Sequence, residues 1–360
     1  MLNRLDDFPV HQTPEPIAHA ATGDRNAYDR YFFNGYAGDG SVFFAVAFGV
    51  YPNRYVQDAH VSVVRDGVQA NVHASRRAPL ERTDLTVGPI RIDVVEPMRR
   101  LRVTCGPNDS GVECDVTFVA RTEAIEEPRF QQRAGTRIVM DYTRFTQFGR
   151  YEGWVSVDGE RTDVTGLVGS RDRSWGIRSV GERDQGAPSL QLPQFFWLWA
   201  PMSFDDACLH FDVQEDADGR RWHRNGSVVP LLDGAPAVEE LHTPEVDHRV
   251  HWRRGTRRSD AATIVIGPHE VELEPLLDFQ MLGIGYFHPE WSHGTWKGED
   301  VTAGDRWRLD ELDPMALQHL HVQQLVRCRW GDRVGIGAFE QLVIGVHHPS
   351  GFHELLDATR

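Results

Sequence analysis

The alternation of apolar and polar residues with a period of two most constrains how this chain can fold. Sustained helical periodicity is nearly absent, and turn residues such as Arg65–Gly67, Pro107–Asp109 and Val157–Glu160 interrupt the alternating segments. The segments span residues 41–52, 58–73, 85–97, 100–121, 151–169, 207–223, 249–255, 262–276, 307–313 and 316–347. The pattern predicts an all-β fold of antiparallel strands, arranged as barrels or sandwiches rather than βαβ units.

The chain is long enough for two such units. It has 360 residues, and residues 180–192 are polar and rich in Gly and Pro, which is typical of a linker. We therefore predict an N-terminal β domain over residues 1–185 and a C-terminal β domain over residues 186–360.

Charge and hydropathy exclude several classes of partner. There are 38 basic and 53 acidic residues, a net charge of −15, which repels phosphate backbones and anionic lipid surfaces. The longest apolar runs, 41–51 and 195–202, are far too short to span a bilayer, and the N-terminus lacks the apolar core of a signal peptide. We expect a cytoplasmic protein that binds no nucleic acid and does not insert into membranes.

The four cysteines match no zinc or redox spacing, so we expect reduced thiols.

Residues 166–178, GLVGSRDRSWGIR, place several charges beside an indole. The local pattern predicts the end of a strand, a sharp loop and a second strand. Charges at a strand end reach over the mouth of a barrel, where β-barrels carry ligand sites. Asp172 is a candidate acid or base, and Arg173 could anchor an oxyanion. Arg178 could also be catalytic, and the alternative for all three is a structural ion-pair network that closes the barrel end. Trp175 is either a ligand wall or a plug stacked on an arginine.

This motif resembles the RDHSWGxR signature of the carotenoid 1,2-hydratase (hydroxyneurosporene synthase) family. Residues 153–160, the aromatic stretch 195–199 and the closing segment 335–340 with Gly345 are similar to parts of the same family. The resemblance implies two lipocalin-like barrels packed together with the motif near their junction. It also implies apolar, polyene-like or polycyclic ligands.

One position departs from the family signature. The hydratases of that family have His where this chain has Arg173, and their downstream Tyr and Asp are replaced here by Trp197, Leu198 and Trp199. Arginine is a poor proton donor. The departure therefore favours a related lyase, isomerase or cyclase over carotenoid hydration itself.

Aromatic residues supply the candidate walls of a ligand site. In Phe195–Trp199 they alternate across both faces of one predicted strand, so one face packs in a core and the other lines a cavity or a domain contact. The candidate substrate-binding residues are Trp175, Phe196, Trp197, Trp199, Tyr142 and Tyr286.

Histidines gather in the second half of the chain. His288 and His319 are further catalytic candidates, as polar groups at a cavity mouth. His319 and His321 form an HxH pair that could bind a metal together with Glu340, but this spacing is a weak signal, and we expect no metal and no organic cofactor.

These observations lead to one functional hypothesis and two alternatives. We expect a lyase or isomerase that hydrates, dehydrates, isomerises or cyclises a bulky, apolar, unsaturated terpenoid, steroid or aromatic compound by proton transfer. The first alternative is a non-catalytic carrier of a lipophilic small molecule, whose cavity would be nearly dry. The second is a scaffold whose second barrel is only an interaction surface, with both barrels filled by side chains and no cavity. A homodimer is compatible with all three.

Overall fold

The computed structural model describes residues 2–179 and 194–359, which form two antiparallel sheets. The predicted all-β, antiparallel fold is therefore confirmed. The first sheet contains β1 (Ala27–Tyr36), β2 (Val42–Tyr51), β3 (Val56–Arg65), β4 (Val68–Arg77), β5 (Thr86–Val87), β6 (Ile90–Glu96), β7 (Arg100–Cys105), β8 (Val112–Ala120), β9 (Ile125–Glu126), β10 (Phe130–Ala134), β11 (Arg137–Val157), β12 (Glu160–Asp163), β13 (Val168–Arg178) and β21 (Val301–Arg308). The second contains β14 (Phe195–Ser203), β15 (Ala207–Glu215), β16 (Arg221–Pro230), β17 (Leu241–Thr243), β18 (Val246–Trp252), β19 (Ser259–Ile266), β20 (His269–Gln280), β22 (Val322–Trp330) and β23 (Arg333–Ile344).

The helices among these residues are short 3₁₀ turns. They are η1 (Arg4–Asp7), η2 (Pro52–Arg54), η3 (Met281–Ile284), η4 (Leu309–Glu311), η5 (Leu317–His319) and η6 (His348–Ser350). None of the helices in the described part of the chain could cross the apolar layer of a membrane.

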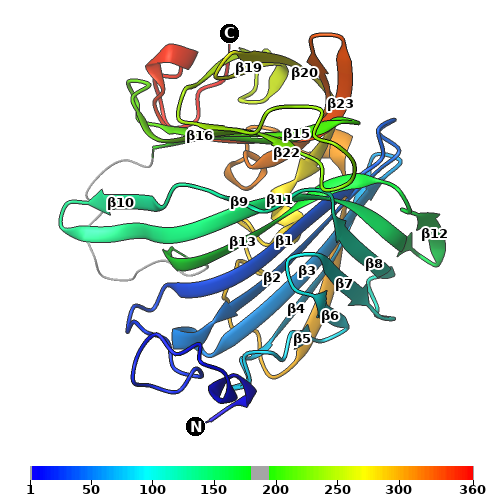
Figure 1. Ribbon diagram of the computed structural model, residues 1–360, viewed down its shortest axis with the longest axis vertical. Helices are drawn as coiled ribbons and strands as arrows, with labels where there is room; N and C mark the ends of the chain where they lie inside the picture. The colour runs from blue at the N-terminus through cyan, green and yellow to red at the C-terminus, as the bar shows by residue number, and fades with distance from the viewer. Residues whose placement is uncertain (1, 180–193, 360) are drawn as a thin grey trace.

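Each sheet curls around its own core. The first runs β21-β4-β3-β2-β1-β13-β11-β8-β7-β6-β5, and β5 at one end contacts β3 and β4 near the other. The second runs β17-β16-β15-β14-β23-β22-β20-β19-β18, and β18 and β19 contact β16. The second sheet lies above the first, and β11 and β13 run along the boundary (Figure 1).

Side-chain alternation separates three cores. On β2, Phe44 points into the first barrel, whereas the adjacent Phe43 faces the second sheet and stacks on Phe279 at 4.7 Å between ring centroids. Leu209 and Phe211 belong to the core of the second barrel. Both barrel interiors are filled by apolar side chains, and a third core joins the sheets.

The motif at residues 166–178 lies mostly within one continuous strand. β13 pairs with β1 on one side and β11 on the other, so the expectation of a sharp loop here is wrong. A Cβ on Gly169 would lie 2.0 Å from the backbone oxygen of Asn34, so glycine at this position permits the close approach of β1. A strand in the middle of a sheet points alternate residues to opposite faces, which decides which charges can reach a ligand.

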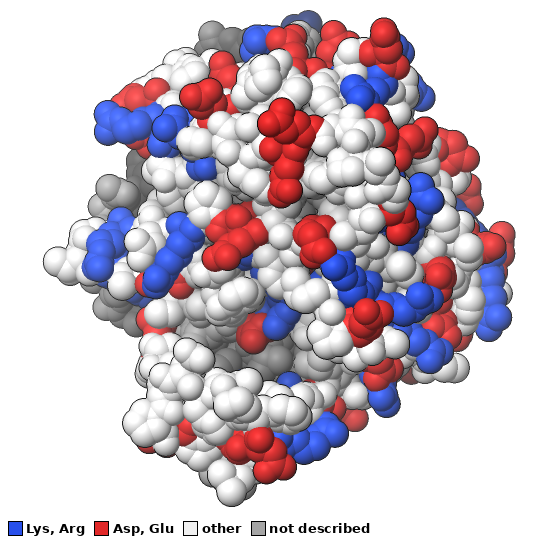
Figure 2. Space-filling view, viewed as in Figure 1, with Lys and Arg blue, Asp and Glu red and all other residues white. Residues whose placement is uncertain are grey.

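The two halves of the chain share the first sheet. β21, from the second half, pairs with β4. The proposed linker at 180–192 lies outside the described residues, so the division near residue 185 stays a prediction. Acidic and basic side chains are interspersed over the face shown in Figure 2, without a large field of one sign. All four cysteines are free and buried.

Candidate active site at the junction of the sheets

A cavity of about 70 Å³ lies between the two sheets. β1, β11 and β13 line it from the first sheet, and β14, β15 and β23 line it from the second. Met281, Tyr286 and His321 complete the wall. Because the barrel interiors are packed, the cavity at this junction is the candidate active site.

The pleat of β13 selects which charges of the motif face the cavity. Asp172, Ser174 and Arg178 line it, whereas Arg171, Arg173 and Trp175 point away. The same alternation on β14 turns Trp197 and Trp199 to the cavity and Phe196 into the core of the second barrel.

Asp172 is an acid that has lost most of its hydration. Burial raises its pKa to about 6, although Arg144 counteracts this effect, and Glu127 adds to it. No described side chain donates a hydrogen bond to its carboxylate. At neutral pH the group therefore exchanges readily between its protonated and ionised forms, which suits a general acid or base.

Glu340 faces the same cavity but has the opposite environment. Its carboxylate accepts hydrogen bonds from Trp197 Nε1 at 3.0 Å, His321 Nε2 at 2.7 Å and Gln323 Nε2 at 2.6 Å. Its pKa is lowered because interactions with His321 and the other donors outweigh the cost of burial. Because Glu340 holds His321 through Nε2, the other ring nitrogen, Nδ1, is the one left for a ligand, and it is buried without a partner among the described residues.

Arg144 links this site to a buried polar network. Its guanidinium pairs with Glu127 and lies 4.8 Å from the ring centroid of Trp197. Asp212 accepts a hydrogen bond from His210 at 2.9 Å in the same network. Arg144 thus presents a compensated positive charge beside Asp172.

Several buried polar atoms that line the cavity lack a hydrogen-bond partner in the described structure. They include Arg30 Nε, Trp199 Nε1, Gln214 Oε1 and His321 Nδ1. Folded proteins rarely leave such atoms unsatisfied. Their convergence on one cavity is expected of a site that binds a polar group.

The cavity contains half of the candidate residues chosen from the sequence. Asp172, Tyr142, Trp197, Trp199 and Tyr286 line it together. They come from β13, β11, β14 and the segment after η3, so the fold gathers residues that are far apart in sequence.

The other five lie elsewhere. Arg173 pairs with Asp29 and stacks on Tyr31, and Trp175 is 42% exposed. Phe196 packs in the second core. His288 Nε2 lies 2.8 Å from Asp305. His319 Nδ1 lies 2.9 Å from the backbone oxygen of Asp313.

The cavity also holds residues that the sequence did not single out as catalytic. Arg30 gave no signal, because it lies in an ordinary alternating strand. His321 and Glu340 stood out only as a weak metal-binding pattern. The 3₁₀ turn η5 ends at His319 and β22 begins at Val322, and His321, which lines the cavity, lies in the short link between them.

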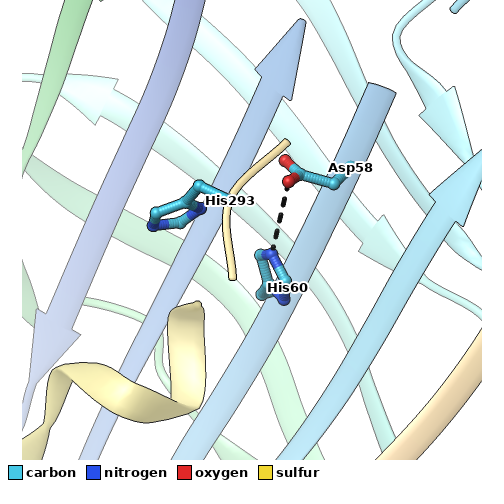
Figure 3. Close-up of side chains that lie close together, drawn as sticks. All are labelled: Asp58, His60 and His293. Atoms are coloured by element: carbon cyan, nitrogen blue, oxygen red, sulfur yellow. Dashed lines mark ion pairs between the residues drawn. The ribbon is translucent and has the colours of Figure 1, made fainter. Parts of the chain in front are cut away.

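One group of possible metal ligands lies behind the cavity, between β3 and the segment after η3. The potential ligand atoms of Asp58, His60 and His293 all lie within 4.8 Å of one another (Figure 3). Arg30, however, donates to His293 Nε2 at 2.9 Å, and the pKa of His293 is held well below its usual value by burial and by Arg30. A neutral His293 then carries its proton on Nδ1, so a cation does not fit while this contact persists.

Two further groups have internal partners. In the first, which combines His73, His288 and Asp305, the backbone N–H of Trp291 donates to His288 Nδ1 at 2.9 Å, which leaves Nε2 to donate to Asp305. In the other, which combines Glu127, Asp212 and His223, the guanidinium of Arg144 already supplies the cation.

The fold recurs in solved structures, and one family model covers nearly the whole chain. A crystal structure of a candidate AttH protein from Nitrosomonas europaea has a TM-score of 0.56 at 15% identity, with 93% of this chain and 98% of that chain covered. Kievitone hydratase from Nectria haematococca gives 0.53 at 15% identity, with 87% and 88% covered. No curated protein sequence matches significantly. The model that matches residues 2–353 describes a family of unknown function (DUF8625), and the chain belongs to this family.

Proposed function

We propose that the protein is a lyase or isomerase that transfers protons to and from an unsaturated substrate in the junction cavity. The observation that carries the proposal is the pair of carboxyl groups facing one cavity with opposite pKa shifts. Burial raises the pKa of Asp172 to about 6, whereas hydrogen bonds and His321 lower that of Glu340. Environments that push two such pKa values apart are typical of active sites, where one carboxyl group can donate a proton while the other stays ionised.

The arrangement suits hydration and its reverse. A protonated Asp172 would donate its proton to one carbon of a double bond while His321 Nδ1 accepts a proton from the attacking water. Water thus adds as H and OH across the bond. Glu340 would hold His321 in the required tautomer and stabilise the imidazolium that forms. Trp197 and Trp199 would supply apolar walls and π faces for a cationic transition state.

Two similarities favour this reaction class. One of the structures with the same fold is named a hydratase, and the β13 motif resembles that of the carotenoid 1,2-hydratase family. With about 70 Å³, the cavity admits the reacting end of a substrate, and the rest of a terpenoid, steroid or aromatic skeleton must extend through the mouth.

The alternative remains a carrier of lipophilic molecules. A carrier cavity needs few charges, whereas Asp172, Glu340, Arg30 and Arg144 all face this one. Buried charges are costly unless they serve a purpose, and their number therefore favours catalysis.

The test begins with native mass spectrometry of the protein purified from its own host, followed by organic extraction. The extracted compound is then incubated with the protein in D₂O. We expect deuterium incorporation at carbon, a loss of at least about 100-fold in Asp172→Asn, and little change in the control Asp29→Asn, which lies outside the cavity. A bound compound that the wild-type protein leaves unchanged would establish the carrier instead.

A further inference from the structure

We propose that Arg30 and Arg178 form a carboxylate-binding subsite in the junction cavity, so that the substrate is an unsaturated carboxylic acid. The inference rests on the proposed function for the reaction that the substrate undergoes. The residues that would bind the carboxylate are different from the proposed acid and base. Arg30 is on β1 and Arg178 is at the end of β13. Their guanidinium carbons lie 5.1 Å and 5.8 Å from the ring centroid of Tyr286. Two cations therefore flank one aromatic ring in the cavity wall.

Arg30 is buried, and no carboxylate in the described part of the chain forms an ion pair with it. It is 3% exposed, and it donates to two neutral acceptors, Tyr286 Oη at 3.3 Å and His293 Nε2 at 2.9 Å. Its Nε has no hydrogen-bond partner among the described residues. Asp58, in the cluster of Figure 3, accepts from the backbone N–H of Gly294 at 2.6 Å instead.

Arg178 has aromatic rather than acidic neighbours. Its guanidinium carbon lies 5.2 Å from the ring centroid of Tyr28 and 5.7 Å from that of Tyr142. No described carboxylate forms an ion pair with it. The other two arginines near the site differ, because Arg144 pairs with Glu127 and Arg173 with Asp29. Among the described residues that line the cavity, only Arg30 and Arg178 carry a positive charge without an ion-pair partner.

A bound anion would neutralise the positive charge of Arg30 and Arg178. Burying a charge without a partner is costly, and that cost is recovered when a ligand supplies the opposite charge. The guanidinium fork matches the two oxygens of a carboxylate in geometry.

The register fixes where the double bond would lie. Arg30 is opposite Ser174, two positions along β13 from Asp172, and two positions correspond to roughly 7 Å of strand. A carboxylate held at Arg30 therefore places a double bond a few bonds away next to Asp172. A bound anion would also favour the protonated form of Asp172, which is the form that donates.

The test measures binding to the full chain by calorimetry, with trans-crotonate, its neutral isostere crotonamide, and methyl phosphate as probes. We expect crotonate to bind at least about tenfold more tightly than either of the others, and Arg178→Met to remove that preference. Arg173→Met, on the opposite face of the same strand, is the matched control and should retain it. Thermal unfolding of each variant verifies that it is folded.

The outcomes separate this inference from the proposed function. Equal affinity for crotonate and crotonamide, no crotonate binding, or a preference that survives Arg178→Met overturns the carboxylate subsite. Methyl phosphate that binds as tightly as crotonate overturns the assignment to carboxylates. Asp172→Asn should still bind crotonate, because Asp172 is not part of the subsite. If the wild-type protein prefers crotonate but leaves the extracted compound unchanged, the proposed catalysis is refuted and the carboxylate subsite stands.

Discussion

Replacing Asp172 with Asn should stabilise the protein at neutral pH but much less at low pH. In the folded protein, burial raises the pKa of Asp172 from an ordinary 3.8 to about 6. Each pKa unit corresponds to about 1.4 kcal/mol, so ionising this carboxyl costs the fold about 3 kcal/mol. Because the folded pKa is the higher one, the contribution of Asp172 to stability is fully present below the unfolded pKa and is lost as the pH rises through about 6.

The assay is urea unfolding of wild type and Asp172→Asn at pH 4 and pH 8. We expect the free energy of unfolding of the variant, relative to wild type, to rise by about 2–3 kcal/mol between these values. Taking the difference between two pH values cancels any fixed packing effect of the amide.

Glu340→Gln is the control with the opposite sign, because the pKa of Glu340 is lowered in the fold. Its stabilising contribution exists above the unfolded pKa and disappears as the pH falls, so this variant should lose stability relative to wild type as the pH rises. If Asp172→Asn also lost stability relative to wild type as the pH rises, the Asp172 carboxylate of the wild-type protein would be stabilised in its ionised form. The reasoning that makes Asp172 an acid near neutral pH would then be refuted.

Three further results are expected. His321→Ala should lower kcat on the extracted compound by about 10²–10⁴-fold while His319→Ala changes it little, and similar losses in both would contradict the assignment of the base. Gly285→Ala should lower the free energy of unfolding by about 1–3 kcal/mol in urea, since its φ is +95° and its Cβ would lie 2.9 Å from His60 Nε2. Phe44→Ala should cost about 3–5 kcal/mol in the same assay, as expected for a fully buried ring in the first core, and a loss below 1 kcal/mol would contradict that packing.

The sequence predicted the fold well because alternation is a local property. It also predicted that Phe195–Trp199 has two functionally different faces, although not which face is which. Phe196 and Trp197 have similar side chains, and only the position of the second barrel's core decides that Phe196 is structural. The same limit applies to Arg173 and Asp172, which are adjacent in sequence and point to opposite sides of β13.

The sequence did not predict which strands pair when they are far apart along the chain. Arg30 becomes a site residue only because β1 pairs with β13, and Glu340 because β23 pairs with β14. Neither position has a distinctive local pattern. The expected loop in residues 166–178 was wrong for a related reason, since the pairing of β13 with β1 and β11 is long-range and leaves no local signal in the sequence.

The position of the cavity has a consequence for how the site works. The proposed acid, Asp172, belongs to the first sheet, and the proposed base lies beside Glu340 of the second. The contact between the two sheets is largely apolar, with rings such as Phe43 and Phe279 stacked across it. Packed interfaces of this kind resist continuous deformation, so the separation of acid and base is set by the same contacts that join the sheets. Catalysis by this pair therefore requires the two sheets to stay packed against each other.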